Sequence, residues 1–288
     1  MKTAANTKDS SKLKKYRISI IVSLLITIFG TLWSAQHFWL DQEEVPVSTL
    51  SAWQLSILRV AHVLPWFASA ETRLDRTIKL SNALLNQRGR WELTEMLTRY
   101  GTALRLLEQH RQAHVLPQRA AFKLALEQIT LMHRGVYFLS RIGQTEEIER
   151  TFQRFTQAYQ ALPSPTLTEQ VDFLTEKMLR SLLLENDIAN AEKMRLASIE
   201  LVANQPAGKL DEQFVNLYFG YGLCFLQNQT GAEYIDIARQ SFSPYPQAMI
   251  WFTTRNWDVG LITAIGFKNA ENTPCHRVTH TNLMNLKP

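Results

Sequence analysis

The sequence predicts a mainly α-helical protein that begins with one transmembrane helix. Residues 18–40 contain no Asp, Glu, Lys or Arg, which is typical of a membrane span. From residue 70 to residue 242, apolar side chains recur every three or four residues, and glycine and proline fall mostly at the breaks. We therefore expect a membrane anchor, then an α-helical hairpin solenoid or bundle, then a short atypical C-terminal segment.

The first predicted element is a basic arm of residues 1–17. It holds six lysines and arginines against one aspartate, which accounts for the whole formal charge of +5 and leaves the rest of the chain neutral. Because the excess is confined to this arm, we expect no basic domain face and no nucleic acid as a partner. Lysine and arginine stay on the cytoplasmic side of short-tailed spans, so the arm is predicted to be cytoplasmic.

The second predicted element is the transmembrane anchor, residues 18–40. As a helix it would be about 35 Å long, enough to cross a hydrocarbon core of about 30 Å. Trp33, Phe38 and Trp39 are the predicted interface anchors at its outer end. The predicted location is the inner (cytoplasmic) membrane, single-pass, with the N-terminus inside and the C-terminal domain in the periplasm or outside. A cleaved signal peptide is the alternative, although its best cleavage site, after Ser34 and before Ala35, is a poor one.

A juxtamembrane linker and an amphipathic helix are predicted for residues 41–69. Pro46 lies in a short acidic linker, and the stretch 48–67 is rich in large apolar residues. A helix that lies on lipid usually carries Lys or Arg along its polar face, and only Arg59 and His62 are available here. We therefore expect this helix to pack on the following domain, with the membrane surface as the alternative.

Residues 70–242 form the predicted α-helical domain. The breaks divide it into helices of roughly 12–20 residues joined by short turns, which is typical of antiparallel helical hairpins. Thr166 and Glu169 have the spacing of a capping box, which predicts a helix start between them. The predicted breaks lie at residues 87–89, near Pro117, and at 143–145, 162–165, 185–187 and 204–208.

The turns of this domain resemble the tetratricopeptide repeat, a family of two-helix units stacked into a solenoid. Gly143 lies at a turn with an apolar residue five positions later and an aromatic residue nine positions later. A second copy has Asn186 at the turn and the small Ala191 on the following helix, and a weaker copy has Gly89. Glycine or asparagine suits a left-handed turn, and alanine lets helices approach closely. Turn spacings of 54 and 43 residues differ from the family's about 34, so a non-repeating bundle is the alternative.

Residues 243–288 are predicted to be a capping segment followed by a loose tail. Residues 243–246 break the helical pattern, and the stretch 249–267 is rich in β-branched and aromatic residues. This composition fits either a β-hairpin or a last pair of capping helices. Residues 268–288 are polar without a periodic apolar face, so we expect them to be loose.

Cys224 and Cys275 are the only cysteines, and both lie on the side of the membrane that we expect to be oxidising. Cys224 stands in an apolar helical stretch, where a free cysteine is commonly a small buried group. Cys275 stands in a polar stretch. A disulfide between them would close a loop of about 50 residues and stabilise the fold by roughly 4 kcal/mol. Free thiols are the alternative, because the Cα separation that decides the matter is not set by the sequence.

No catalytic, cofactor-binding or metal site is predicted. The sequence lacks a phosphate-binding glycine loop, a dinucleotide fingerprint, a nucleophile elbow and an HExxH motif. His110 and His114 lie one helical turn apart, as do His276 and His280 beside Cys275, but neither set has a complete group of ligands nearby. We expect these histidines to have no metal.

The predicted function is that of a membrane-anchored, non-enzymatic scaffold. The concave face of stacked hairpins would bind other membrane or envelope proteins, in assembly, chaperone-like or regulatory roles. The alternative is a single-pass sensor that passes a signal through its anchor to a partner, although a cytoplasmic arm of residues 1–17 is too short for an output domain. An enzyme would need a cleft of dispersed residues that the sequence does not reveal.

Overall fold

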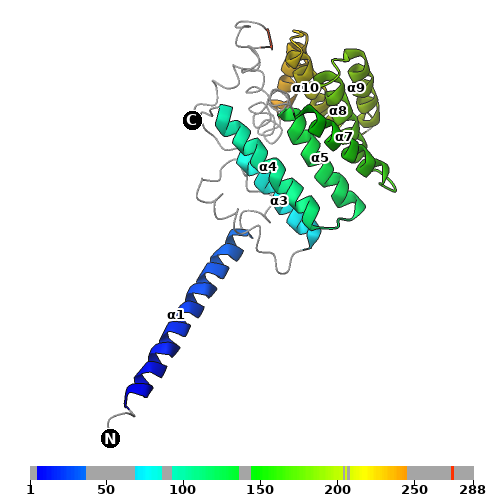
Figure 1. Cartoon of the computed structure of the whole chain (residues 1–288). Helices are drawn as coiled ribbons and strands as arrows, with labels where there is room; N and C mark the ends of the chain where they lie inside the picture. The colour runs from blue at the N-terminus through cyan, green and yellow to red at the C-terminus, as the bar shows by residue number, and fades with distance from the viewer. Residues whose placement is uncertain are drawn as a thin grey trace. The chain divides into compact units, whose positions relative to one another are not determined.

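The computed structural model describes residues 5–36, 69–85, 93–135, 144–203, 205, 208–244 and 274–275. Over these residues all regular secondary structure is α-helical, which confirms the predicted all-α class (Figure 1). The chain divides into two compact units, Met1–Gln87 and Arg88–Pro288. The predicted juxtamembrane helix and the stretch 249–267 with its two alternatives lie outside the described residues.

Helix α1 (Ala5–Gln36) carries a long exposed apolar surface. From Ile18 to Phe29 its large apolar side chains are between 44% and 67% exposed. The hydroxyls of Thr27 and Thr31 donate to backbone carbonyls one turn earlier, at 2.9 and 2.8 Å, so they are satisfied within the helix. Among the described residues, no helix combines the length and the apolar character needed to cross a membrane. The described helices therefore do not support the transmembrane part of the predicted fold class.

Helix α3 (Ala70–Leu85) belongs to the same unit and buries one face. Leu74, Leu80 and Leu84 are each at most 1% exposed, as expected from the apolar stripe in the sequence. At its start the Ser69 hydroxyl accepts a hydrogen bond from the backbone N–H of Thr72 at 3.1 Å, which satisfies one of the donors left open at a helix N-terminus.

The second unit is a series of helices joined by short turns. Helices α4 and α5 pack together, α5 packs on α7, and each helix from α8 to α11 packs on the next. The turns at residues 114–117, 161–166 and 184–187 confirm three predicted breaks. The helices are α4 (Leu93–Ala113), α5 (Gln118–Arg134), α7 (Thr145–Gln160), α8 (Leu167–Leu183), α9 (Ile188–Val202), α10 (Gly208–Phe225) and α11 (Gly231–Phe242).

One turn was not among the predicted breaks, the turn between α10 and α11. It contains no proline, and Gln227 adopts the left-handed region with a φ of 61°. The side-chain oxygen of Asn228 accepts hydrogen bonds from the backbone N–H and the hydroxyl of Thr230, at 3.2 and 2.8 Å. Asparagine side chains commonly stabilise turns through such local hydrogen bonds.

Side-chain caps fix the starts of α8 and α9. The Thr166 hydroxyl accepts from the N–H of Glu169, whose carboxylate accepts from the N–H of Thr166 at 2.7 Å, so the predicted capping box is confirmed. Asp187 caps α9 by accepting from the N–H of Asn190 at 3.0 Å. Asn186, just before this cap, has a φ of 55°, a conformation that asparagine tolerates.

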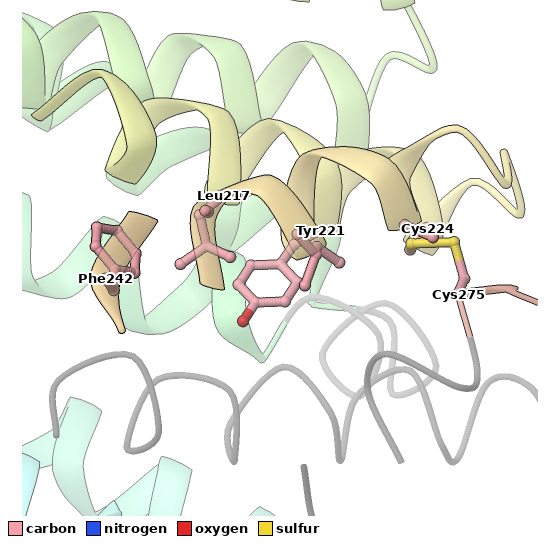
Figure 2. Packing of buried hydrophobic residues seen from close by; sticks show 8 residues of the cluster. Leu217, Tyr221, Cys224, Phe242 and Cys275 are labelled. Atoms are coloured by element: carbon pink, nitrogen blue, oxygen red, sulfur yellow. A yellow bond between two sulfur atoms is a disulfide. The ribbon is translucent and has the colours of Figure 1, made fainter. Parts of the chain in front are cut away.

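The core of the second unit consists of successive clusters between neighbouring helices. Between α5, α7 and α8 it is aromatic, and the rings of Tyr159 and Phe173 stack with centroids 3.9 Å apart and planes 3° from parallel. Between α8, α9 and α10, Ala191 is fully buried among larger apolar side chains. Between α10 and α11, Leu217, Tyr221 and Phe242 pack in one cluster with the cysteines (Figure 2).

Helices α10 and α11 approach closely where two glycines face each other. A Cβ atom at Gly220 would lie 2.7 Å from the carbonyl oxygen of Gly231, and one at Gly231 would collide with the carbonyl oxygen of Gly220. Because the obstructing atoms belong to the backbone, a methyl group requires the helices to move apart. Gly101 on α4 is different, since nothing lies within 4 Å of its Cβ position.

We predict opposite effects for two glycine-to-alanine substitutions. Gly220→Ala should lower the free energy of unfolding by about 1–3 kcal/mol, because it overpacks the α10–α11 contact. Gly101→Ala makes the same change on an exposed helix surface and should raise it by up to about 1 kcal/mol. Urea unfolding followed by circular dichroism measures both, and equal effects would contradict the close approach.

Candidate functional site

Two adjacent hollows lie on the surface formed by α4, α5 and α7, which we call the α4–α5–α7 groove. Their volumes are about 420 and 390 Å³, and they share Arg154 and Gln157. The first hollow is lined otherwise only by polar side chains: Glu108, Glu147, Arg150 and Gln153. It is therefore a charged concave surface rather than a gap in the apolar core.

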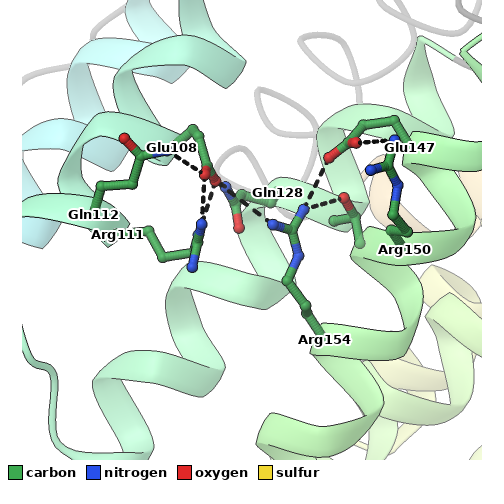
Figure 3. Close-up of polar contacts among 8 residues, drawn as sticks. Glu108, Arg111, Gln112, Gln128, Glu147, Arg150 and Arg154 are labelled. Carbon is green, nitrogen blue, oxygen red and sulfur yellow. Dashed lines mark hydrogen bonds and ion pairs between the residues drawn. The ribbon is translucent and has the colours of Figure 1, made fainter.

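Glu108 on α4 organises the polar contacts of the groove (Figure 3). Its Oε1 accepts from Nη2 of Arg111 at 2.6 Å and from Gln112 at 2.8 Å. Its Oε2 accepts from Nε of Arg111 at 2.9 Å and from Gln128 on α5 at 3.2 Å. The Nη1 atom of Arg154 on α7 lies 3.8 Å away. One carboxylate thus links three helices.

These donors keep Glu108 ionised. They lower its pKa from 4.5 to about 2, with the hydrogen bond from Arg111 as the largest cause and partial burial acting against the shift. Because the folded pKa lies below the ordinary value, the contribution of Glu108 to stability is present above about pH 4.5 and is lost as the pH falls towards 2.

Arg154 is held in place on α7 by two further groups. Its Nη2 atom donates to the Glu147 carboxylate at 3.1 Å and to the Thr151 hydroxyl at 2.7 Å (Figure 3). Glu147 also pairs with Arg150 at 3.0 Å, whose side chain is 65% exposed. Arg150 and Arg154 therefore lie along one face of α7.

The second hollow has a different chemistry. Its apolar lining comes from the α4–α5 turn, α5 and α7: Leu116, Ala121, Leu124, Ala125 and Ala158. Its charged or titratable lining consists of Arg111, His114 and Arg154, and no carboxylate lines it. An apolar group next to an anion matches this surface.

A second polar cluster, between α5 and α8, is closed to solvent. The His133 Nδ1 atom and a Glu176 oxygen lie 2.6 Å apart, and their side chains are 1% and 6% exposed. The Thr130 hydroxyl donates to the other Glu176 oxygen at 2.5 Å. Nε2 of His133 is buried and has no hydrogen-bond partner among the described residues. Because the pair is inaccessible, it ties α5 to α8 rather than acting on a substrate.

Asp172 lies one turn before Glu176 on α8 and has an unusual pKa. Burial raises the pKa of Asp172 from 3.8 to about 7, and the nearby negative charges of Glu176 and Glu169 add to the shift. In the folded protein the Asp172 carboxyl therefore keeps its proton up to about neutral pH. The free energy of unfolding falls where this carboxyl must ionise.

The two cysteines are bonded in the structure. Their Cα atoms are 5.6 Å apart, within the usual range for a disulfide, and the bridge joins residues separated by 51 positions. The backbone N–H of Cys275 donates to the Gln229 side chain at 3.0 Å, in the α10–α11 turn. Residues 274–275 are thereby fixed to the end of α10 (Figure 2).

The remaining residues singled out by the sequence are not brought together. The rings of His110 and His114 are 4.6 Å apart, but the described residues contain no group of three or more His, Cys, Asp or Glu side chains that could hold a metal ion. Asn186 and Ala191 lie in the α8–α9 hairpin and line neither hollow. Several of the other predicted residues lie outside what the structure describes: the side chain of Trp33, and Phe38, Trp39, Gly89, Gly143, His276 and His280.

Apart from His114, the groove residues were not singled out by the sequence analysis. Glu108 and Arg111 are three residues apart on α4, a spacing that is common on solvated helix faces. Gln128 and Arg154 reach Glu108 only because α5 packs on both α4 and α7. No local pattern marks this convergence.

Comparison of the chain with protein-family models, with curated proteins and with solved structures found no match.

We predict that Asp172→Asn alters how stability depends on pH. In the unchanged protein the free energy of unfolding should fall by about 2–4 kcal/mol between pH 4 and pH 7, because the unfolded Asp172 ionises near its ordinary pKa and the folded one resists. Asp172→Asn should remove this fall, whereas Asp211→Asn, which leaves Asp172 in place, should keep it. Urea unfolding at several pH values measures the difference, and parallel profiles would contradict the assignment.

We also predict that the denatured, unreduced protein reacts with no thiol reagent, and with two equivalents after reduction. Cys275→Ser should loosen residues after 243 without unfolding residues 70–240, because Cys224 lies at the end of α10 and the helices before it keep their contacts. The loss should be at most about 4 kcal/mol, the entropic value of a loop of this length. Hydrogen exchange measured by mass spectrometry locates the loosened region, and faster exchange throughout α5 to α9 would oppose the prediction.

Proposed function

We propose that this protein is a membrane-tethered helical scaffold whose α4–α5–α7 groove binds other envelope proteins outside the cytoplasm. The groove itself carries the proposal, because it is a concave, charged surface built by three packed helices. Concave faces of helical hairpins are suited to holding a peptide or a partner helix. Tetratricopeptide-like stacking of the hairpins is part of this proposal.

A binding role is supported by the state of the groove's carboxylates. Glu108 has a pKa of about 2, far from the value near neutrality that suits proton transfer. Glu147 is held in ion pairs with Arg150 and Arg154. Both carboxylates therefore position arginines, which favours recognition over catalysis.

A membrane tether is supported by the first unit. The apolar side chains of α1 from Ile18 to Phe29 are exposed, a surface that water does not stabilise and lipid does. The proposed span continues to Leu40, beyond the last described residue of α1, and the basic arm precedes it. Tethering raises the effective concentration of the groove for proteins of the same membrane.

A location outside the cytoplasm is supported by the disulfide between Cys224 and Cys275. Such bonds persist in oxidising compartments and are rare in the cytosol. The positive arm before the apolar segment, with acidic residues after it, gives the same orientation.

The binding role predicts where the protein should be cross-linked to partners. A photoreactive amino acid at Gln157, in the groove, should form adducts with envelope proteins in intact cells. The same amino acid at Gln240, an exposed glutamine on α11, should form few. Equal adducts at both positions, or none at Gln157 and Gln153, would contradict a binding groove on this face.

The proposed orientation predicts the outcome of reporter fusions. A reporter that is active only outside the cytoplasm should work when fused after Pro288, and one that is active only in the cytosol should not. Replacing the lysines and arginine of residues 1–17 by glutamine should weaken this preference, because they set the orientation. An active cytosolic reporter on the unchanged chain would overturn the location.

A further inference from the structure

From the chemistry of the second hollow, we infer that the α4–α5–α7 groove recognises an acidic peptide segment in which a carboxylate stands next to an apolar side chain. This inference rests on the proposed function and deepens it by naming the partner's chemistry. The hollow offers an apolar floor that includes Ala121 and Leu124, beside the cations Arg111 and Arg154.

The arginines have donors to spare. Arg111 uses Nε and Nη2 on Glu108, so its Nη1 group has no hydrogen-bond partner among the described residues. Arg154 uses Nη2 on Glu147 and Thr151, and its Nη1 lies 3.8 Å from Glu108, within ion-pair range but longer than a hydrogen bond. Both guanidinium groups are therefore oriented by the protein and still able to bind an incoming carboxylate.

The carboxylates, in contrast, have little capacity left. Glu108 accepts four hydrogen bonds, from Arg111 twice, from Gln112 and from Gln128, which fills the lone-pair sites of a carboxylate. Glu147 pairs with two arginines. A basic partner would have to displace these contacts, whereas an acidic partner adds to them.

The length of the surface favours a peptide over a small carboxylate. The lining residues on α7 run from Glu147 to Ala158. At 1.5 Å per residue this is about 16 Å, the length of about five residues of extended chain. The first hollow, with Arg150 exposed at its rim, can then contact a second acidic residue of the same segment.

The experiment uses the full-length chain in detergent. Random twelve-residue peptides displayed on phage are selected against it, and the enriched peptides are resynthesised with a fluorescein label for polarisation measurements. We expect enriched peptides to carry Asp or Glu within two positions of Leu, Ile, Val or Met. Replacing those acids by Asn or Gln in the peptide should weaken binding about five- to tenfold, the size of one or two charged hydrogen bonds at a partly exposed site.

Matched protein variants locate the binding. Arg111→Gln and Arg154→Gln should each weaken binding about fivefold or more. Arg239→Gln should leave binding unchanged, although Arg239 is 38% exposed and paired with an acid three residues away, much as Arg111 is 42% exposed and paired with Glu108. Ala121→Leu, which fills the apolar floor and keeps every charge, should also weaken binding. Circular dichroism of each variant shows that it is folded.

Three outcomes would overturn the inference: enriched peptides that are basic or uncharged, enriched peptides that bind Arg111→Gln as well as the unchanged protein, or no enrichment. A single acetylated amino acid that binds as tightly as the peptides would overturn the peptide assignment. If cross-linking at Gln157 captures envelope proteins while the selected peptides are basic, the scaffold proposal stands and the acidic partner is wrong. If the peptides behave as expected but cross-linking at Gln157 fails, the surface chemistry stands and the scaffold role is wrong.

Discussion

The helices of the second unit carry large apolar side chains, which can leave water only by packing against the helices beside them. Phe155 on α7 is fully buried because the rings of Phe122 on α5 and Phe173 on α8 both pack on it, with centroids 5.4 and 5.5 Å away. The same requirement joins α8 to α9 and α10, and α10 to α11. Which helices pack together decides which helix faces stay exposed to solvent. On α7 the remaining face is the one that carries Glu147 and Arg154.

Carboxylates in the two polar clusters of this unit experience opposite environments. Glu108 receives donors from arginine and two amides, and its pKa falls to about 2. Asp172 is half-buried near the negative charges of Glu176 and Glu169, and its pKa rises to about 7. The donors around Glu108 keep its negative charge at the open surface of the groove. The raised pKa of Asp172 makes the environment of α8 sensitive to pH. Glu108 therefore keeps its charge across the pH range in which Asp172 loses its proton.

The disulfide and the two facing glycines, Gly220 and Gly231, all lie at the contact between α10 and α11. The glycines let the helices approach, which places Cys224 beside the α10–α11 turn, and Cys275 is held there by the bridge and by its hydrogen bond to Gln229. Residues 274–275 are thus attached to the α10–α11 hairpin.

The sequence by itself determined the helical class, most of the turns and the capping box at Thr166, because these features depend on residues within about four positions of each other. It missed the turn at Asn228, whose side-chain oxygen accepts a hydrogen bond from the backbone N–H of Thr230. It could raise a bridge between Cys224 and Cys275 only as one of two alternatives, since their Cα separation depends on how a segment 51 positions away returns to α10. Only the tertiary structure decided the groove and the pKa of Asp172. Glu108 meets Gln128 and Arg154 through helix packing, and the burial of Asp172 comes from the same packing, so neither leaves a local signal in the sequence.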